Sequence, residues 1–448
     1  MQRLLFCLVY NSNDMKIAVI GSGLSALGAL SALNGKKLNI DLYRSVEIVD
    51  ESPKHRLYLK NGKLIIHKSV ETLEGLRKIF EENNSLRVKK GTEICGLLSS
   101  NYIGGLSNFW GGSSNKIMDF EKNDFKDAGL NISGHYEKVT EFINSEIISD
   151  EYYRSDNSES EKDKWLSTIN LNNHQSSSIF SSFEFLKNLE INQIDRHVID
   201  MDQKDAGIKL FHKKGNNICH TEYDYVFVAA GAFASPILAG RLKKTSFTTS
   251  LYTNDQRIFL ASYKLKSSLM NFLKDFNGPP SLLVNFKNQK FYIQLYPIKK
   301  LYPLKLLSGQ EMMSNGFLIG YVYNESKNSN HIEMKFHDGN LELAVKKNRT
   351  IENKKKEIQR ILSKEGIKLI SPLVSLSTGS SQHIASSLCN PLNELNNLGS
   401  LTNDFCFKDY ERVFFLDSSV FPYSPLCTIG LTAMTSSHYI TEKILNNL

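Results

Sequence analysis

"KIAVIGSGLSALGALSAL", residues 16–33, combines a short apolar run, a turn with two glycines and a run of leucines and small residues. The apolar run has the pattern of a buried strand, and the run after the glycines has the composition of a helix. Strand, glycine turn and helix in this order begin a doubly wound α/β domain. The stretch therefore predicts the first unit of a parallel sheet that binds a nucleotide.

The turn has the spacing G-x-G-x-x-A, formed by Gly21, Gly23 and Ala26. The first glycine permits the tight turn, the second lets a pyrophosphate approach the backbone, and the small third residue lets helix and strand pack. The backbone amides at the helix start, at Leu24 and Ser25, then face the phosphate charge. The alternative is an ordinary tight turn, but the strand and helix around it favour nucleotide binding.

One expected partner of a dinucleotide is missing from the next strand. That strand usually ends in a carboxylate that binds the ribose hydroxyls. Here "LNIDLYR" ends at Arg44, and Asp41 lies inside the strand. Either Arg44 favours a phosphorylated ribose or its side chain is simply solvated, and both alternatives stay open.

The length of 448 residues predicts two domains. We interpret residues 1–14 as an N-terminal extension. Residues 15–245 and 371–448 are expected to be two parts of one nucleotide-binding domain. Between them, residues 246–370 contain alternating segments such as "KFYIQLYPI" and "HIEMKFHD", which predict an inserted antiparallel sheet.

The composition, with 41% apolar and 23% charged residues, is typical of a soluble globular protein. The net charge of +7 comes from scattered lysines, so we expect no nucleic-acid partner. No apolar stretch reaches the length of a membrane span. The six cysteines are far apart and lack metal-ligand spacing, so we expect no metal site, and reduced thiols in a cytoplasmic protein.

Three further motifs follow the glycine turn along the chain: "GGLSNFWGGSS" at 104–114, "VFVAAGAFASP" at 226–236 and "FFLDSSVFPYSP" at 414–425. With these four motifs in this order, the sequence resembles the glucose-methanol-choline (GMC) family of FAD-dependent oxidoreductases. The resemblance covers most of residues 15–245 and 375–448. It implies an α/β fold with a Rossmann-like FAD-binding domain and an inserted antiparallel-sheet substrate domain.

The resemblance also implies which residues contact FAD. The glycines around the tryptophan would let the backbone run alongside the flavin, and a further glycine at 231 would let another loop pass near it. From the residues alone, two alternatives remain open. The glycine-rich segment is a surface loop anchored by Trp110, and Asp417 only caps a turn. The implied contacts are Gly21, Gly23, Leu24, Ser25, Ala26, Gly105, Asn108, Trp110, Gly111, Gly112, Val198, Ala230, Gly231, Asp417, Ser419, Leu426, Cys427 and Thr428.

The last three of these residues precede the final helix. If the helix N-terminus points at the pyrimidine edge of the flavin, as the resemblance implies, its dipole favours the negative charge of the reduced ring. Leu426, Cys427 and Thr428 would supply the nearby amides. We interpret Cys427 as a packing residue rather than a nucleophile, because the sequence shows no paired histidine or basic activator.

Oxidation of an alcohol by a flavin needs a base for the hydroxyl proton while hydride passes to the flavin. "SSQHIASSL" at 380–388 resembles the family's H-x-x-G-T segment, which assigns the base to His383. A lone histidine is otherwise often structural. The family's second pocket residue corresponds to Ser424, which forms hydrogen bonds but cannot replace an imidazole. Ser424 followed by Pro425 also fits a helix N-cap, which we favour.

The expected activity is oxidation of an alcohol group, with a sugar or glycan intermediate as the substrate that the family's habits suggest. The aromatic residues Phe291, Tyr292, Tyr296 and Tyr321 are expected to build the core of the insertion rather than to stack on a sugar. The electron acceptor stays unassigned. Two alternatives remain open, a catalytically impaired GMC-like nucleotide-binding scaffold and an NAD(P)-dependent dehydrogenase.

Overall fold

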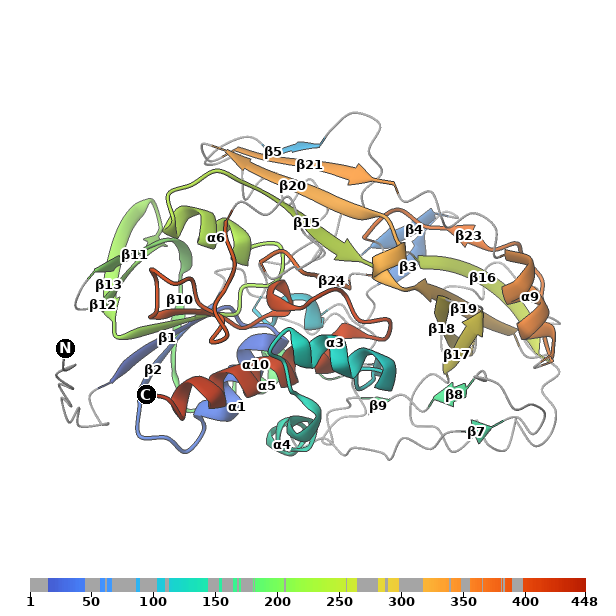
Figure 1. Ribbon diagram of the computed structural model, residues 1–448, viewed down its shortest axis with the longest axis horizontal. Helices are drawn as coiled ribbons and strands as arrows, with labels where there is room; N and C mark the ends of the chain where they lie inside the picture. Colours follow the sequence, from blue (N-terminus) through green and yellow to red (C-terminus); the bar gives the residue numbers. More distant parts are fainter. Residues whose placement is uncertain are drawn as a thin grey trace.

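The structure is a computed structural model, shown in Figure 1. It describes residues 15–44, 57–60, 63–66, 86–88, 103–108, 113–143, 153–154, 164–166, 169–170, 180, 182–204, 207–254, 256–263, 281–286, 289–297, 317–337, 340–347, 355–364, 366–379, 381, 383–388 and 398–448. Within these ranges no helix is both long and apolar enough to cross a membrane.

A parallel sheet forms the part of the molecule to which the glycine turn belongs. Its central strand and the two strands on one side of it are almost continuously apolar, as buried parallel strands usually are. The strand that starts it is buried over its last four residues. In spatial order the sheet contains β10 (Asn192–Asp195), β2 (Asn39–Arg44), β1 (Lys16–Ile20), β14 (Tyr225–Val228) and β25 (Val413–Phe415), all parallel.

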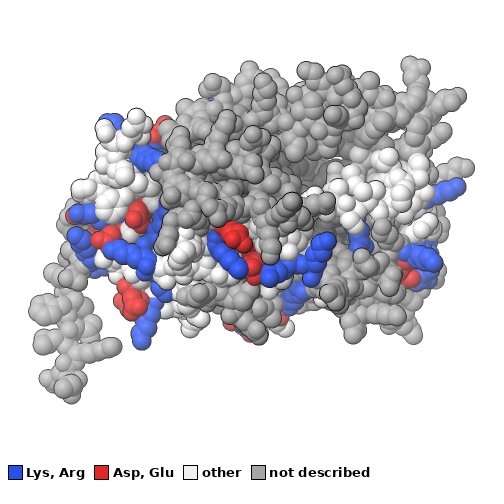
Figure 2. Space-filling view, turned by 90° about the horizontal axis from the view of Figure 1, so that it is seen from above, with Lys and Arg blue, Asp and Glu red and all other residues white. Residues whose placement is uncertain are grey.

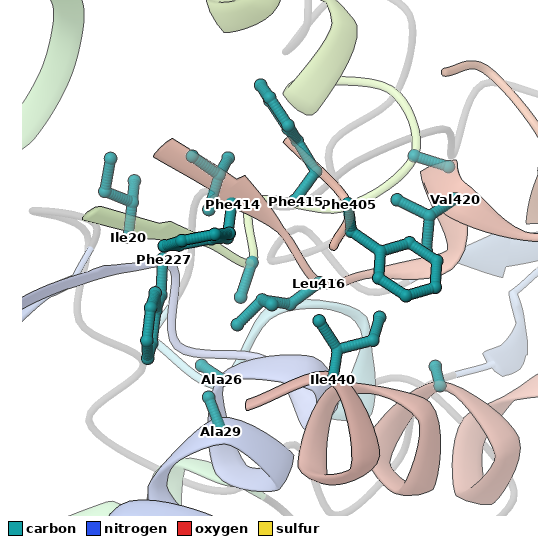
Figure 3. Close-up of a cluster of buried hydrophobic side chains, with 14 of the residues drawn as sticks. Ile20, Ala26, Ala29, Phe227, Phe405, Phe414, Phe415, Leu416, Val420 and Ile440 are labelled. Carbon is teal, nitrogen blue, oxygen red and sulfur yellow. The ribbon is translucent and has the colours of Figure 1, made fainter. Parts of the chain in front are cut away.

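Two helices from opposite ends of the chain pack together beside this sheet, α1 (Leu24–Leu33) and α10 (Ile429–Leu445). They approach so closely at Gly28 that a Cβ there would lie 1.9 Å from the carbonyl oxygen of Met434. Figure 3 shows part of the core between helices and sheet, where Ala26 and Ile440 lie near Leu416. The N-terminal and C-terminal parts of the chain therefore share one core.

A three-stranded antiparallel meander follows β10 and consists of β11 (His197–Lys204), β12 (Gly207–Lys214) and β13 (Asn217–Tyr223). The remaining helices near the parallel sheet are short. They are α3 (Lys122–Asp127), α4 (Tyr136–Phe142), α5 (Ser182–Leu186) and α6 (Ser235–Leu242), with 3₁₀ turns η1 (Gly105–Asn108), η2 (Asp119–Glu121), η3 (Ser133–His135) and η8 (Ser418–Val420).

The strands expected in the insertion are present, but they form two sheets rather than one. One sheet has the order β24 (Ile384–Ala385), β15 (Phe247–Thr253), β20 (His331–His337), β21 (Asn340–Lys346) and β5 (Leu86–Val88). The other sheet has eight strands. Seven follow the order β22 (Ile367–Leu369), β16 (Gln256–Tyr263), β19 (Phe317–Asn324), β18 (Gln289–Pro297), β17 (Ser281–Phe286), β8 (Lys164–Leu166) and β7 (Tyr153–Arg154), and the eighth, β23 (Val374–Ser375), pairs with β16. Alternation along a strand reveals its two faces but not its partner strand.

Smaller elements complete the described part of the chain. They are the hairpin β3 (Leu57–Lys60) and β4 (Lys63–Ile66), the pair β6 (Ser113–Ser114) and β9 (Ile169–Asn170), turn η6 (Ser326–Asn328) and helix α9 (Lys355–Lys364). Helix α9 packs its apolar residues against the eight-stranded sheet. In Figure 2, Lys and Arg are intermixed with Asp and Glu over the described surface in view.

Candidate functional site

The first glycine turn has the tight geometry that its spacing predicts. Gly21 has a φ of +117°, and a Cβ there would lie 2.3 Å from the carbonyl oxygen of Ala229 at the end of β14. Its N–H donates to the carbonyl of Tyr43 on β2, 2.9 Å away. Glycine is required at this position because only it accepts both the left-handed conformation and the close backbone. The turn thus holds the ends of β1, β2 and β14 close together, next to the start of α1.

A second glycine loop lies over this turn. Gly104 and Gly105 have φ values of +94° and +58°, and a Cβ on Gly105 would lie 3.4 Å from the Cα of Gly23. The Gly104 N–H donates to the Ser22 hydroxyl over 3.0 Å. Two backbones without side chains therefore face each other at the start of α1.

Helix α1 begins next to these two loops without a side-chain cap. Gly23 is the N-cap and makes no side-chain cap bond, and the first turn contains no acidic residue. The amides of Leu24 and Ser25 belong to this turn, where the helix dipole favours an anion. Trp110, Gly111 and Gly112 lie outside the described residues, as does the side chain of Asn108.

Asp417 fastens a third glycine loop to the end of β25. Its carboxylate accepts hydrogen bonds from the Gly231 N–H (2.8 Å), the Ser235 hydroxyl and the Ser419 N–H (2.9 Å). Burial raises the pKa of Asp417, and these bonds oppose the rise. The side chain thus caps η8, as the alternative interpretation of this residue expects, and leaves only backbone groups of Asp417 for a ligand.

Open space lies beside Gly231 in this loop. Gly231 has a φ of +90°, and among the described residues, its two chain neighbours aside, no atom lies within 4 Å of the place where its Cβ would be. Ala230, between Gly231 and the strand end, is half-buried. The Ser419 hydroxyl, in η8, is buried next to the Asp417 carboxylate. The space at Gly231 fits a ligand that runs beside the loop.

Arg44 is held by a neighbouring strand. Its guanidinium bonds both carboxylate oxygens of Asp195, at 2.6 and 3.0 Å, and also contacts Gln193. Asp195 ends β10, which pairs with β2 in parallel register. Because this bidentate ion pair already engages the positive charge of Arg44, that charge is not free for the phosphate of a phosphorylated ribose. Sequence reasoning missed Asp195, because it lies 151 residues beyond Arg44.

His383 immediately precedes β24 and is half-buried. Its ring stacks on Tyr323 of β19, with a centroid separation of 5.3 Å and an interplanar angle of 17°. Its Nδ1 is buried and has no hydrogen-bond partner. Burial lowers the pKa of His383 from 6.5 to about 4. The imidazole is therefore neutral at neutral pH and able to accept a proton.

Ser424 lies beside His383 but does not cap a helix. Its hydroxyl donates to the backbone carbonyl of His383 over 3.0 Å, and the residue is fully buried. The predicted N-cap is wrong, because α10 begins at Ile429 with Thr428 as its N-cap. Other side chains hold the preceding loop out of the helix: the Ser326 hydroxyl donates to the Ser424 carbonyl, and the Asn254 amide to that of Pro425.

The residues before α10 use part of their bonding capacity within the protein. The Leu426 N–H donates to the Glu121 carboxylate over 2.8 Å, so this amide already has an acceptor. Thr428 accepts from the Asn115 N–H over 3.1 Å. Cys427 is buried with its Sγ 3.4 Å from the Lys116 carbonyl, which agrees with a packing role.

Glu121 is a buried acid that sequence reasoning missed. It accepts from two backbone amides, those of Leu426 (2.8 Å) and Met118 (3.2 Å). Burial raises its pKa from 4.5 to about 7, against the lowering effect of these bonds. The only signal in the sequence was the position of Glu121. It lies three residues after Met118 at the start of a short helix, which is the spacing of a capping box.

A polar network from the insertion reaches the same place. The Tyr292 hydroxyl donates to Oδ1 of Asn115 over 2.8 Å and bonds the Ser281 hydroxyl over 2.8 Å. Tyr292 packs with Leu426 and Cys427, whereas Phe291 points to the opposite face and into the core of the eight-stranded sheet. The expectation of core packing is confirmed for these two aromatics, but Tyr292 also lines the site.

The other predicted residues are less closely connected to this site. Tyr321 is partly buried against Tyr292 and its neighbours, and the side chain of Tyr296 lies outside the described residues. Val198 lies near the start of β11, next to an irregular pairing between Val198 and Asp200. Its side chain is buried in the core, so a ligand contact there would use its backbone.

Comparison with solved structures identifies proteins of the same fold. Pyridoxine 4-oxidase from Mesorbium loti matches with a TM-score of 0.54 and 8% identity over 96% of this chain and 99% of its own. Two structures that concern FAD modification in Aspergillus oryzae RIB40 formate oxidase match with TM-scores of 0.58 and 0.60, each with 10% identity over 97% of this chain and 98% of theirs. No family model matches the sequence, and the comparison with curated proteins gives no match. The expected fold class is confirmed.

Proposed function

We propose that this chain, which has the fold of the GMC oxidoreductases, is an FAD-dependent oxidoreductase that converts an alcohol to a carbonyl compound. One observation carries the proposal: two bare glycine loops meet at an uncapped helix start, while a neutral imidazole whose Nδ1 has no hydrogen-bond partner lies near a third glycine loop. The two loops meet at Gly23 and Gly105, and the imidazole is that of His383.

Hydrogen bonds connect the His383 segment to the third glycine loop, at Gly231. The Ser418 hydroxyl donates to the carbonyl of Ile384, and the Ser418 carbonyl accepts from the Ser386 N–H. His383 directly precedes Ile384 in the chain. Asp417 directly precedes Ser418, and its carboxylate accepts a hydrogen bond from the Gly231 N–H. A long ligand with a diphosphate at one end and a reactive ring at the other suits such an arrangement.

The described residues fit FAD in type as well as in position. The amides of Leu24 and Ser25 would bind the pyrophosphate, and the space beside Gly231 and the hydroxyl of Ser419 would receive the middle of the cofactor. Bound FAD supplies the acceptor for two electrons and a hydride. The N-terminus of α10 at Thr428 would favour negative charge on the ring that it faces.

In this proposal His383 is the base. The alcohol loses its hydroxyl proton to an unprotonated imidazole nitrogen of His383 and its carbon-bound hydrogen, with two electrons, to the acceptor. Stacking on Tyr323 orients the ring, and the Ser424 hydroxyl fixes the backbone that carries it. Ser424 is thus a positioning residue, because its hydroxyl is engaged by the His383 carbonyl.

The family's habits suggest a sugar or a glycan intermediate as the alcohol, and we propose it as the first class to test. The buried Tyr292 network offers hydroxyl and amide groups at the side of the site formed by the insertion. The domain boundaries expected at residues 245 and 370 and a cytoplasmic location likewise stay predictions.

The two other functions differ in what supports them. The engagement of the Leu426 amide by Glu121 favours the scaffold alternative, because one predicted cofactor contact is already satisfied by the protein. The interpretation as an NAD(P)-dependent dehydrogenase depends on Arg44 as a phosphate ligand, but Arg44 forms an ion pair with Asp195. FAD therefore remains the better-supported cofactor.

The decisive experiment is an absorbance spectrum of the purified full chain, followed by anaerobic addition of a panel of sugars and simple alcohols. We expect flavin bands in the purified or FAD-reconstituted protein and their bleaching by at least one alcohol. A flavin that binds but is bleached by none of them supports the scaffold. A chain that retains no flavin after reconstitution and binds NADP⁺ instead overturns the proposal.

A further inference from the structure

Two histidines and a glutamate meet on the far part of α10. His135 comes from η3, whereas His438 and Glu442 come from the helix, and one ligand atom from each lies within 4.8 Å of the others. The rings of His135 and His438 are 5.5 Å apart at their centroids, and Nδ1 of His135 is 3.4 Å from a Glu442 oxygen. Imidazole and carboxylate are ligands that divalent zinc prefers.

The sequence spacing brings two of these groups to one side of a helix. His438 and Glu442 are four residues apart, which places them one above the other on the same face. Two ligands at this spacing are a common way for a helix to hold zinc. The third ligand was invisible to sequence analysis, because His135 lies about 300 residues earlier in the chain.

The nitrogens that would bind an ion make no hydrogen bond within the described part of the chain. His438 is 4% exposed, and its Nε2 is buried without a hydrogen-bond partner. Its Nδ1 bonds the Ser31 hydroxyl of α1 over 2.7 Å, as the second nitrogen of a metal-binding histidine usually does. Nδ1 of His135 is also buried and makes no hydrogen bond.

Charge and access also suit a cation. The cluster combines two imidazole nitrogens with one carboxylate, which supplies negative charge for a cation. The Glu442 side chain is 35% exposed, which gives an ion a path from solvent. One feature opposes binding: the Lys138 ammonium contacts the Glu442 carboxylate at 2.7 and 3.0 Å.

We propose that His135, His438 and Glu442 form a binding site for a divalent zinc ion, with water in the fourth position. Ligand distances of about 2.0–2.2 Å require the three side chains to rotate inward. The Lys138 side chain, which is 49% exposed, moves away when the ion neutralises Glu442. The ion then fastens the segment before α4 to the last helix.

This site is separate from the proposed catalytic site. His438 is ten residues beyond the N-cap at Thr428, which corresponds to roughly 15 Å along the helix axis. The zinc ion therefore takes no part in the proton transfer to His383. Loss of zinc binding and loss of flavin reduction are consequently independent outcomes.

The test is calorimetric titration of zinc chloride into the chelator-treated full chain, with three variants and a control. We expect one zinc ion per chain and loss of that binding in His438→Ala. Ser31→Ala should weaken binding by about 10-fold or more, because it removes only the orienting hydrogen bond. His220→Ala removes an exposed histidine from β13 and should bind zinc as the wild type does.

Lys138→Met distinguishes a metal site from a simple ion-pair cluster and does not depend on the folding of His438→Ala. Removal of the competing ammonium should tighten zinc binding and increase the rise in melting temperature that zinc produces. In an ion-pair cluster, the same substitution only destabilises the protein. Absence of stoichiometric zinc binding in both the wild type and Lys138→Met, or unchanged binding in both His438→Ala and Ser31→Ala, overturns the proposal.

Discussion

The hydroxyl of Ser424 donates a hydrogen bond to the backbone carbonyl of His383, 3.0 Å away. This contact joins the loop before α10 to the start of β24, and it brings together the two residues assigned to the catalytic pocket. The contact uses the backbone of His383 and the side chain of Ser424. The imidazole itself is oriented from the opposite side, by Tyr323.

Ser424→Ala should therefore act on stability more than on chemistry. We expect a loss of about 1 kcal/mol in the free energy of unfolding, since one buried hydrogen bond disappears, and less than about tenfold loss of kcat/KM. Urea unfolding and steady-state kinetics measure the two effects. Ser326→Ala is a matched control, because it removes another buried hydroxyl that bonds the same loop. A loss of turnover specific to Ser424→Ala and much larger than tenfold would show that Ser424 touches the substrate.

His383→Asn should retain flavin and lose turnover. A general base contributes about 10²- to 10⁴-fold, so we expect kcat to fall in this range. His220→Ala, at an exposed position, should leave kcat unchanged. Rapid mixing with substrate under anaerobic conditions measures the reduction step directly. Bleaching of the variant at the wild-type rate would remove His383 from the mechanism.

The pH dependence of the wild type provides a separate test of the same residue. Because burial lowers the pKa of His383 to about 4, its neutral form persists well below pH 6.5. The acid limb of kcat/KM should therefore lie near pH 4 rather than near 6.5 and should be absent from the residual activity of His383→Asn. A limb centred at 6.5 or above would contradict a buried, neutral base.

Gly105→Ala should weaken FAD binding more than it weakens the fold. The added Cβ would lie 3.4 Å from the Cα of Gly23 and would occupy the bare surface above the glycine turn. Gly35→Ala is the matched control, because Gly35 also has a positive φ, +74°, but no protein atom lies near its Cβ position. Both substitutions carry a backbone strain of about 1 kcal/mol. Flavin titration should separate them, and equal FAD affinities in the two variants would argue against a cofactor at this loop.

Glu121→Gln should change how stability depends on pH. The pKa of Glu121 is raised to about 7 in the folded protein from 4.5, so its contribution to stability is complete below pH 4.5 and is lost as the pH rises through 7. Each pH unit that separates the folded from the unfolded pKa corresponds to about 1.4 kcal/mol of lost stability. The difference in unfolding free energy between Glu121→Gln and the wild type should therefore move in favour of the variant between pH 4.5 and pH 8. A constant difference across this range would show that the pKa of Glu121 is the same in the folded and unfolded protein.

Local patterns predicted the features that depend on neighbouring residues. The strand and turn at Gly21 follow from adjacent residues, because the steric demands of the turn are local. The fold class followed from four motifs in order. The cap at Ser424 failed for a long-range reason, since Asn254 and Ser326 hold the loop in a non-helical form. Propensity cannot anticipate such tertiary contacts.

The site residues that sequence reasoning missed share one property, which is distance along the chain from their partners. Asp195 lies 151 residues from Arg44, and Glu121 lies 305 residues from Leu426. A pattern in one sequence reports on contacts within a helix or a strand, and it carries no signal for pairs that the fold brings together. The two-sheet arrangement of the insertion was hidden for the same reason.

The contact of Gly28 with Met434 has a consequence for synthesis of the protein. Helix α1 is synthesised long before α10, whose residues supply the surface that covers it. Nascent chains consequently carry an uncovered apolar helix while the residues between the two helices are synthesised, and such surfaces promote aggregation. A premature stop before α10 removes this cover completely, so we expect truncated products to be captured by chaperones or degraded.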